Sequence, residues 1–360
     1  MRIAVVNLTS GGLSGGYRKY LSRLMPLLAN DPRVTALSVF VPEAAAAEVD
    51  RGIDVRTWPR QHAGTRFTTL VRDVVASAPD VVFVPTARHT QFGNLPVVVM
   101  VRNMEPLTVP FDGNTWAEGL KNVARAWEAR RACRRAARVI AVSGHVRDFI
   151  VSRWQIDRDR VGTVYHGVDE AGPAAVTHAA RPCTLFTAGS IRPARGLEDV
   201  IRALPLLDAD VRLLIAGQVD ARCAGYAEQL RRLCGDLGVV SRVTFAGQFG
   251  PSDMAEAFWR CAAFVMTSRA EACPNTALEA MSYGCAIVSV DRAPMPEFLG
   301  EAALYYPVAE VRVLAEHLRA VLTNTAEHDR LARAARRRAA GFPWEATRDR
   351  TIQELERARS

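Results

Sequence analysis

Short apolar runs alternate with amphipathic stretches along almost the whole chain. In the first half, strands are expected at 2–7, 35–41, 81–84, 96–101, 138–142 and 161–165, and helices at 16–29, 66–77, 116–136 and 144–153. Such regular alternation of strand and helix is typical of βαβ units built around a parallel sheet.

A second series begins at 183–188. Further strands are expected at 211–216, 242–246, 263–267 and 286–290, and helices near 197–207, 224–236, 253–261, 276–283 and 311–323. Between the two series, small residues and prolines at 172–182 show no periodicity, which is typical of a linker. We therefore expect an α/β protein with two domains, 1–171 and 183–342, whose parallel sheets face a central cleft.

Composition is compatible with this division. The chain has 360 residues, of which 49% are hydrophobic and 23% charged, enough for two domains that each bury a core. It has no apolar run long enough to span a membrane. The seven cysteines are odd in number and include no C-x-x-C pair, which favours free thiols and a cytoplasmic setting. The net charge of +8 favours anionic partners without selecting among phosphates, acidic lipids and nucleic acid.

One expected helix carries a concentrated positive charge. Between 116 and 138, seven basic residues face two acidic ones, and Arg130, Arg134 and Arg138 recur at a spacing that places them on one face. Such a face is ordinarily solvated and covers one side of a sheet. The segment 121–138 is also suited to docking on an anionic membrane surface. No aromatic–basic motif accompanies it, so we expect no nucleic-acid partner.

The first strand runs into a loop rich in glycine. Gly11, Gly12, Gly15 and Gly16 lie between strand 2–7 and the following helix, where glycines let backbone N–H groups approach an anion closely. The spacing is not G-x-G-x-x-G, so it gives little support to a dinucleotide site. The loop either closes the first βα unit as a turn or contacts a phosphate or substrate.

A basic loop follows the first strand of the second half. Strand 183–188 leads into Gly189, and Arg195 and Gly196 come directly before the helix that we expect from Leu197. A cation followed by glycine at a helix start supplies charge and free backbone N–H donors together, which suits a diphosphate. The pattern alone is weak, because surface loops often contain arginine and glycine.

Two glutamates follow strand 263–267. Glu271 lies in the loop, and we expect Glu279 in the first turn of the next helix. Their carboxylates could reach opposite ends of an extended ligand, while backbone N–H groups between them face its anionic centre. Thr276 and Glu279 also fit a capping box, in which the carboxylate only satisfies a backbone N–H. Both interpretations of Glu279 stay open. Glu271 precedes the expected helix and has no capping role, so a ligand-binding role is favoured for it.

These segments resemble family 4 of the retaining glycosyltransferases. The stretch 271–288 resembles the family's E-x7-E motif and the E-A-M-x-x-G-x-P-V-V that follows it, and 296–297 resembles its L-P-E. The stretch 164–169 resembles the N-G-V-D before the interdomain linker, and 342–344 resembles the start of a helix that crosses back to the first domain. The resemblance covers nearly the whole chain. It implies the GT-B fold of two facing Rossmann-like domains, with 343–360 as the crossing helix.

The resemblance also implies roles for individual residues. Glu271 would bind the hydroxyls of the donor sugar, Glu279 the ribose hydroxyls, and Arg195 the diphosphate. Gly15 and Gly16 match the glycine pair that closes over the phosphates. The other residues expected to line the donor site are Ser190, Gly196, Asn275, Thr276, Ala277 and Leu278.

Two positions depart from the family pattern. Ser190 stands where an arginine usually follows the strand, and Arg192 could substitute for it. Arg102 stands near the position of a histidine in the acceptor domain, which argues against a histidine-assisted mechanism. The acceptor-side candidates are therefore Arg102, Asn103 and Glu105, with no choice made among them.

Together these features indicate a retaining, metal-independent glycosyltransferase with Glu271, Arg195 and Arg192 at its catalytic centre. The arginines would stabilise the charge that grows on the leaving phosphate. The D-A-D sequence at 208–210 precedes a strand, so we interpret it as a turn and not as a metal site. The co-substrate would be a nucleotide-diphosphate sugar of the UDP or GDP type, with no separate cofactor.

The acceptor hydroxyl would belong to a glycan, a glycolipid or a small molecule. Cell-envelope polysaccharide biosynthesis at the inner face of the membrane is the setting we expect. Two alternatives stay open. One is a catalytically silent subunit that binds sugar or lipid in a glycan assembly complex, and the other is a nucleotide-sugar 2-epimerase of the same fold.

Overall fold

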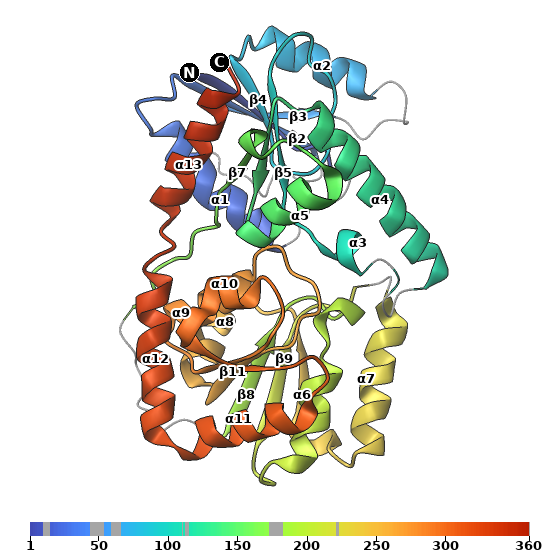
Figure 1. The fold of residues 1–360 in the computed structure, drawn as a ribbon, viewed down its shortest axis with the longest axis vertical. Coiled ribbons are helices and arrows are strands. Elements are labelled where there is room, and N and C mark those ends of the chain that lie inside the picture. Colours follow the sequence, from blue (N-terminus) through green and yellow to red (C-terminus); the bar gives the residue numbers. More distant parts are fainter. Residues whose placement is uncertain are drawn as a thin grey trace. The chain divides into compact units, whose positions relative to one another are not determined.

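The computed structural model describes residues 1–9, 15–43, 54–58, 66–109, 111, 115–172, 183–220 and 223–359. The chain divides into two compact units, and each contains one parallel sheet with helices around it (Figure 1). Unit 1 comprises Met1–Met104, Val123–Gly167 and Pro343–Ser360, and unit 2 comprises Glu105–Asn122 and Val168–Phe342. Apart from Gly172, the expected linker 172–182 lies outside the described residues.

Unit 1 is built on a seven-stranded parallel sheet with the order β3-β2-β1-β4-β5-β6-β7. The strands are β1 (Arg2–Val6), β2 (Ala36–Pro42), β3 (Asp54–Trp58), β4 (Val81–Val84), β5 (Val97–Val101), β6 (Arg138–Ala141) and β7 (Val161–Thr163). Every residue of β4 and β5 is buried. Their nearly continuous valine runs suit central strands covered on both faces, because β-branched side chains pack well against a pleated surface.

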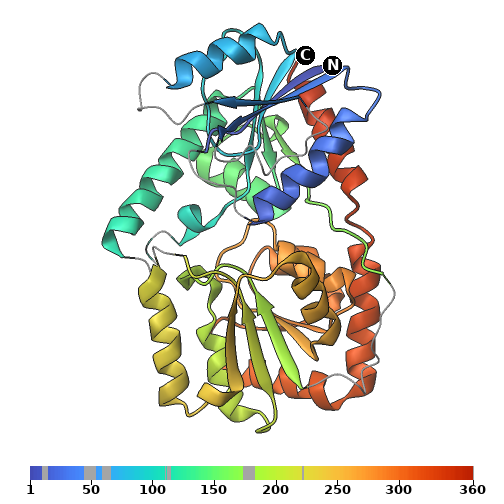
Figure 2. The same ribbon diagram turned by 180° about the vertical axis from the view of Figure 1, so that it is seen from behind.

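The helices of unit 1 come from both ends of the chain. Those that lie wholly in this unit are α1 (Gly15–Ala29), α2 (Arg66–Ala76), α5 (Gly144–Trp154) and α13 (Trp344–Arg357), and most of α4 (Trp116–Arg135) belongs to it as well. The last helix, α13, lies beside α1 and packs on β6 (Figures 1 and 2). Arg138 on β6 pairs with Glu354 of α13 at 2.6 Å, and Thr347 donates to the carbonyl of Tyr165 at 2.9 Å.

Unit 2 is built on a six-stranded parallel sheet with the order β10-β9-β8-β11-β12-β13. The strands are β8 (Thr184–Ala188), β9 (Arg212–Ala216), β10 (Val243–Gly247), β11 (Ala263–Met266), β12 (Ile287–Val290) and β13 (Ala303–Tyr306). The central strands β11 and β12 are wholly buried. Asp208 to Asp210 lie in a turn before β9, which confirms the turn expected there.

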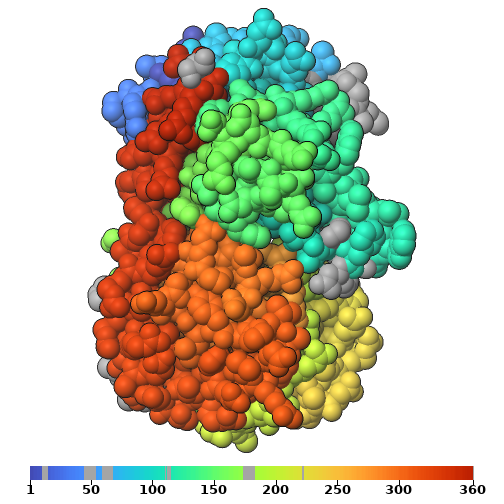
Figure 3. All heavy atoms as spheres, viewed as in Figure 1, coloured from blue at the N-terminus to red at the C-terminus, as the bar shows by residue number. Residues whose placement is uncertain are grey.

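Among the described residues, seven α-helices of unit 2 follow β8 in the sequence. They are α6 (Glu198–Ala203), α7 (Ala224–Asp236), α8 (Pro251–Arg260), α9 (Asn275–Ser282), α10 (Met295–Leu299), α11 (Val311–Thr323) and α12 (Thr325–Ala339). Helix α12 packs on α9 and α11, and α11 packs on α6. Orange and red segments that include α10, α11 and α12 form most of the visible face of unit 2 in Figure 3, so the sheet is covered on that side.

The structure confirms the expected α/β class, with two parallel sheets, and corrects several element bounds. Strands β3 and β13 were not expected, and both are edge strands. Helix α4 spans Trp116–Arg135, and Arg138 lies in β6. The expected cationic helix face therefore ends at Arg135, because Arg138 belongs to the sheet and is paired with Glu354. A short helix, α3 (Glu105–Thr108), precedes α4.

Candidate functional site

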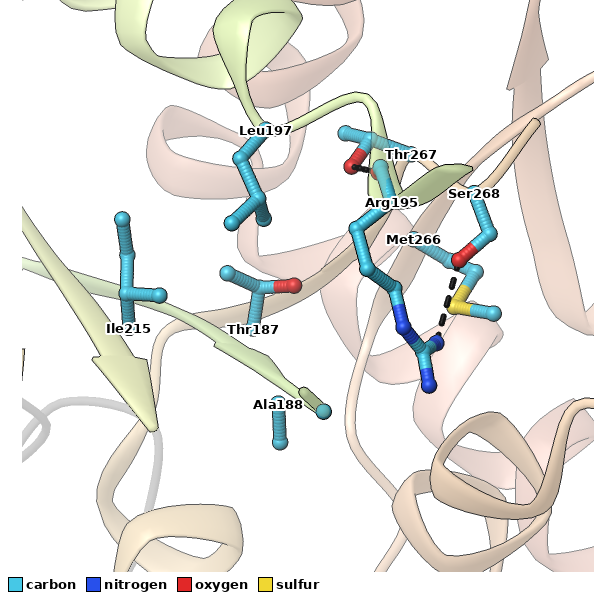
Figure 4. A pocket seen from close by; sticks show the side chains of 9 residues that line it. Thr187, Ala188, Arg195, Leu197, Ile215, Met266, Thr267 and Ser268 are labelled. Carbon is cyan, nitrogen blue, oxygen red and sulfur yellow. Dashed lines mark hydrogen bonds between the residues drawn. The ribbon is translucent and has the colours of Figure 1, made fainter. Parts of the chain in front are cut away.

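The loops after β8 and β11 bring the sequence-predicted donor residues of unit 2 together. In a parallel sheet the carboxyl ends of neighbouring strands meet at one edge, and β8 pairs directly with β11. After β8 the chain passes through Gly189 and forms a 3-10 turn at Pro193–Arg195. After β11 it runs through 267–274 into α9. A pocket opens between the two loops, and Arg195 and Ser268 line it (Figure 4).

Arg195 lies at the centre of this arrangement. Its Nη1 lies 2.6 Å from Oε1 of Glu271 and donates to the hydroxyl of Ser268 at 3.1 Å. The hydroxyl of Thr267 donates to the carbonyl of Arg195 at 2.6 Å (Figure 4). These contacts fix both the main chain and the guanidinium, so the side chain points across the ends of β8 and β11.

Glycine at 189 makes room for this arginine. Gly189 has a φ of 138°, a conformation that residues with a side chain rarely adopt. A Cβ atom there would lie 2.6 Å from Cζ of Arg195. The glycine that ends the strand therefore determines where the cation lies.

Arg192 is held by a different carboxylate. Its Nη1 lies 2.6 Å from Oε2 of Glu105, the first residue of α3, and both side chains are largely buried. Nearby, Val109, Ala194 and Ala270 form a small buried apolar cluster. Glu105, one of the three acceptor-side candidates, thus belongs to unit 2 and neutralises a candidate catalytic arginine.

Arg269 supports the loop from behind. It bonds to Asp199 at 2.9 Å and to Glu198 at 3.2 Å, and Tyr306 donates to Asp199 at 3.1 Å. Burial disfavours the charged form of Arg269, but Asp199 and Glu198 more than offset this and raise its pKa. Its backbone N–H also donates to the carbonyl of Ala194 at 2.7 Å. The turn that contains Arg195 is therefore braced by a buried cation.

Three guanidinium groups in this region have unused donors. The Nε of Arg192, the Nε of Arg195 and Nη1 of Arg269 are buried and have no hydrogen-bond partner among the residues that the structure describes. Buried polar groups are nearly always paired in native proteins. Several unpaired cationic donors at one sheet edge are an arrangement that an anionic ligand would complete.

Backbone N–H groups contribute less here than the sequence suggested. Gly196 N donates to Pro193, and Leu197 N donates to the hydroxyl of Tyr226 at 3.1 Å. These two N–H groups are therefore not free for a ligand. The preceding 3-10 turn and the tyrosine already use them.

Helix α9 begins differently from the expectation. Its N-cap is Pro274, no side chain caps it, and its first turn contains no acidic residue. Glu279 is therefore in the second turn, and the capping-box interpretation with Thr276 as the cap is wrong, because Thr276 lies inside the helix. The N–H groups of Asn275 and Ala277 donate to Cys273 and Pro274. Glu279 and Thr276 are half-buried, and Leu278 is buried.

The remaining candidates differ in exposure and in the unit to which they belong. Ser190 is exposed, with Gly196 buried in the same loop. Gly15 and Gly16 form the exposed start of α1 in unit 1. Also in unit 1, Arg102 is half-buried after β5 and Asn103 is exposed. The unit boundary therefore falls among the three acceptor-side candidates, with Arg102 and Asn103 in unit 1 and Glu105 in unit 2.

Sequence reasoning missed the supporting residues Thr267, Ser268 and Arg269. Their position gave a usable signal, because residues directly after a buried parallel strand lie at the ligand-binding edge of such sheets.

Within the described residues, no helix is both long and apolar enough to span a membrane. The same residues contain no cluster of three or more histidine, cysteine or acidic side chains suited to a metal ion.

Two family profiles match the chain. The profile described as Glycosyltransferase Family 4 matches residues 14–171, and the one described as Glycosyl transferases group 1 matches 172–338. Together they cover all the candidate residues above.

Curated relatives match more weakly. The D-inositol 3-phosphate glycosyltransferases of Streptomyces avermitilis and Mycobacterium tuberculosis are each 26% identical, over 234 and 223 residues. Each alignment covers 58% of this chain, and they cover 49% and 46% of those proteins. The chain thus spans about half the length of the curated relatives it matches.

Solved structures match over nearly the full length. HepE of Anabaena in complex with UDP is 19% identical, with a TM-score of 0.77, over 99% of this chain and 100% of that one. Sucrose-phosphate synthase from Thermosynechococcus elongatus is 16% identical, with a TM-score of 0.75, over 98% of both chains. At these identities the likeness concerns the fold, and it is to two-domain, Rossmann-like structures.

Proposed function

Because the chain belongs to the family 4 glycosyltransferases with the GT-B fold, we propose that it transfers a sugar from a nucleotide-diphosphate sugar to an acceptor hydroxyl. The observation that best supports this proposal is the pair of arginines after β8, Arg192 and Arg195. Each is held by a carboxylate through Nη1, and each has a buried Nε–H without a partner in the described chain. A diphosphate supplies the oxygens that these donors need.

The arginines would act on the leaving group. Negative charge grows on the departing phosphate as its bond to the anomeric carbon breaks, and fixed cations stabilise that charge most strongly where water is excluded. Arg195 is well placed for this role because Ser268, Thr267 and Gly189 fix its position. Its charge and that of Arg192 would make a divalent cation unnecessary. We further propose that the anomeric configuration is retained, as the family resemblance implies.

Glu271 would have a second role once the donor binds. In the structure its carboxylate contacts Arg195, in the position where a phosphate oxygen would bind. When the diphosphate engages the guanidinium, the carboxylate can turn to accept hydrogen bonds from the sugar hydroxyls. Glu279, half-buried in the second turn of α9, would accept from the ribose hydroxyls. Ser190, Gly196 and Asn275 to Leu278 complete the proposed donor site.

We propose UDP or GDP as the nucleotide, and the UDP complex of HepE favours UDP. The acceptor would be a glycan or a lipid-linked sugar, or a small molecule, and Gly15 and Gly16 at the start of α1 would bind a substrate through their backbone N–H groups. Helix α4 presents exposed tryptophan and arginine side chains. These support a peripheral position on the inner face of the cell membrane, and we propose a part in cell-envelope polysaccharide synthesis as the function that suits such a position.

The test is a calorimetric titration with UDP, GDP, ADP, CMP and dTDP, followed by a transfer assay with the sugar forms of the nucleotide that binds. Transfer should persist in EDTA, and NMR should show the donor's anomeric configuration in the product. Failure of every nucleotide to bind would overturn the proposal. Loss of transfer in EDTA, or an inverted product, would overturn only metal independence or retention.

A second candidate function is favoured by one observation. Ser190 is exposed where family members usually have an arginine, and both remaining arginines are neutralised by carboxylates. A silent subunit that binds sugar or lipid within an assembly complex would fit this loss of free charge. Hydrolysis of the bound donor by the purified chain would exclude it. Nucleotide binding with no hydrolysis and no transfer to any glycan acceptor would favour it.

A further inference from the structure

Unit 1 contains a second edge suited to a ligand. Its strand order, β3-β2-β1-β4-β5-β6-β7, reverses direction between β1 and β4. Helices leave opposite faces of such a sheet at this point, and ligands of α/β proteins bind outside the carboxyl ends of the strands there. Asn7 follows β1, Thr86 lies just beyond β4, and Arg102 follows β5 directly. The three residues therefore come from adjacent strands.

Arg102 is the most unusual of the three. Its guanidinium carbon lies 3.6 Å from the ring centre of Tyr17, and it contacts no carboxylate among the described residues. The arginines of unit 2 at 192, 195 and 269 each have an acidic partner at 3.2 Å or less. Burial lowers the pKa of Arg102, and Tyr17 and Tyr20 offset this only in part. A partly desolvated cation without a counter-ion is unfavourable, and an anion would relieve the cost.

Neutral donors lie at the same edge. Nδ2 of Asn7 and the hydroxyl of Thr86 are buried and have no hydrogen-bond partner in the described part of the chain. The carbonyl of Thr86 accepts a hydrogen bond from the N–H of Met100 at 3.3 Å. Met100 lies on β5 two residues before Arg102, so this bond holds Thr86 beside β5. The oxygen of the Asn7 amide is already used by Thr9, so the amide nitrogen is the group that remains.

The start of α1 adds to the positive potential. Tyr17, under the guanidinium of Arg102, lies in the first turn of this 15-residue helix, and that turn contains no acidic residue. A helix N-terminus carries a partial positive charge. Arg102 and the helix therefore repel each other, although mildly, unless an anion lies between them.

We propose that Asn7, Thr86 and Arg102 bind an anionic group of the acceptor, a phosphate or a carboxylate. This inference rests on the proposed transfer activity and narrows its acceptor to a negatively charged sugar or polyol. A guanidinium fork matches either oxyanion in a two-bond geometry, while the amide and hydroxyl donate to the remaining oxygens. The Tyr17 ring beneath Arg102 would hold the fork in place.

The experiment titrates inorganic phosphate, and acetate in a parallel arm, into the full chain at low ionic strength. Calorimetry is run with and without saturating UDP, so that the nucleotide occupies the arginines of unit 2. We expect one saturable site that persists with UDP. Arg102→Gln should weaken it at least tenfold, and Arg102→Lys less, because lysine keeps the charge and loses the fork. The anion that binds more tightly identifies the acceptor group.

Two further variants keep the result interpretable. Thr86→Val keeps the side-chain shape and removes the hydroxyl, so the affinity for the anion should fall several-fold. This variant tests the site even if the Arg102 variants fold poorly. Arg72→Gln removes an exposed charge on α2 and should change nothing. No saturable anion binding in the presence of UDP, or equal binding by Arg102→Gln and wild type, would overturn the inference. Failure of UDP itself to bind would instead count against the proposed function.

Discussion

Oε2 of Glu105 lies 2.6 Å from Nη1 of Arg192, and this contact neutralises one of the two arginines proposed to bind the diphosphate. The donor must then compete with an internal carboxylate. Glu105→Gln keeps the side-chain size and removes the charge, so UDP should bind about 3- to 10-fold more tightly, equivalent to roughly 0.7 to 1.4 kcal/mol. Calorimetry with UDP measures the change.

The control for this prediction is Glu128→Gln, which removes a half-exposed carboxylate on α4. That variant should leave UDP affinity unchanged. Weaker UDP binding by Glu105→Gln would mean that Glu105 orients Arg192 for the ligand and does not compete with it.

Arg195 should contribute strongly to the rate of sugar transfer. Arg195→Ala removes the cation next to Ser268 and Glu271, so the leaving phosphate loses a fixed charge. We expect a loss of roughly 2 to 4 kcal/mol of transition-state stabilisation, as is typical for such groups. Transfer rates measured at saturating and limiting donor, with Arg195→Lys as the matched variant, test this. Activity within about threefold of wild type would remove Arg195 from the proposed mechanism.

Much of the fold could be predicted from the sequence because its central strands are continuous apolar runs. The two strands that were missed, β3 and β13, are edge strands. In β3 only Trp58 is buried, so its sequence lacks the apolar run that identifies a covered strand. A solvated edge such as β3 leaves a weak hydrophobic signal, whereas β13 is a short apolar run with no exposed residue, so exposure does not explain why it was missed.

The site was predictable only in part. Arg195 and Glu271 were expected separately, and their direct contact depends on the conformation of Gly189, which spacing does not reveal. The partner of Arg192 is 87 residues away in sequence, in a short helix that was not expected. Ion pairs between distant segments depend on tertiary packing, and local patterns carry no information about them.

Glu279 can now be tested without the ambiguity of a capping role. Helix α9 starts at Asn275 with Pro274 as its N-cap, so Glu279→Gln leaves the helix cap unchanged and should lower the melting temperature by no more than about 4 °C, the shift that a loss of 1 kcal/mol causes in a domain of this size. UDP affinity should fall about tenfold, because a neutral amide is a weaker acceptor for the ribose hydroxyls. A calorimetric titration with UDP, beside a thermal melt, separates the two effects. Unchanged affinity would exclude Glu279 from the ribose site.

Asp31 should give unit 1 an acid-sensitive anchor. It bonds to Arg33 at 2.7 Å and to Arg348 of α13 at 3.2 Å, and the hydrogen bonds from Arg33 hold the pKa of its carboxyl far below the usual range. A lowered pKa stabilises the fold above the unfolded value near about 4, and this stabilisation is lost as the pH falls below it.

Asp31→Asn should therefore cost roughly 2 to 4 kcal/mol at pH 7, since both arginines lose a buried partner. The variant should also lose less stability than wild type between about pH 4 and pH 2. Urea unfolding at a series of pH values measures both effects. The more exposed Asp349 provides the control, and Asp349→Asn should cost less than about 1 kcal/mol. Equal effects of the two variants would contradict the burial argument.

Helix α4 has one face suited to an anionic membrane. Trp116, Leu120, Val123 and Trp127 are 76%, 54%, 46% and 62% exposed, and their spacing places them on a single side of the helix. The exposed Arg131 and Arg135 continue that side, with Arg131 stacked over Trp127 at 5.4 Å. Apolar anchors followed by arginines are the pattern of helices that lie in the membrane interface.

Removing two charges from this face should weaken membrane binding measurably. Each arginine near an anionic surface contributes about 1 kcal/mol, so Arg131→Gln with Arg135→Gln should reduce affinity for phosphatidylglycerol vesicles roughly 30-fold at low salt. Arg231→Gln with Arg232→Gln removes the same net charge from α7 of unit 2 and should have little effect. Co-sedimentation at low and high salt measures binding, which should weaken as salt screens the charges. If wild type fails to bind at low salt, or both double variants bind equally weakly, α4 is a solvated basic face and the acceptor needs no membrane.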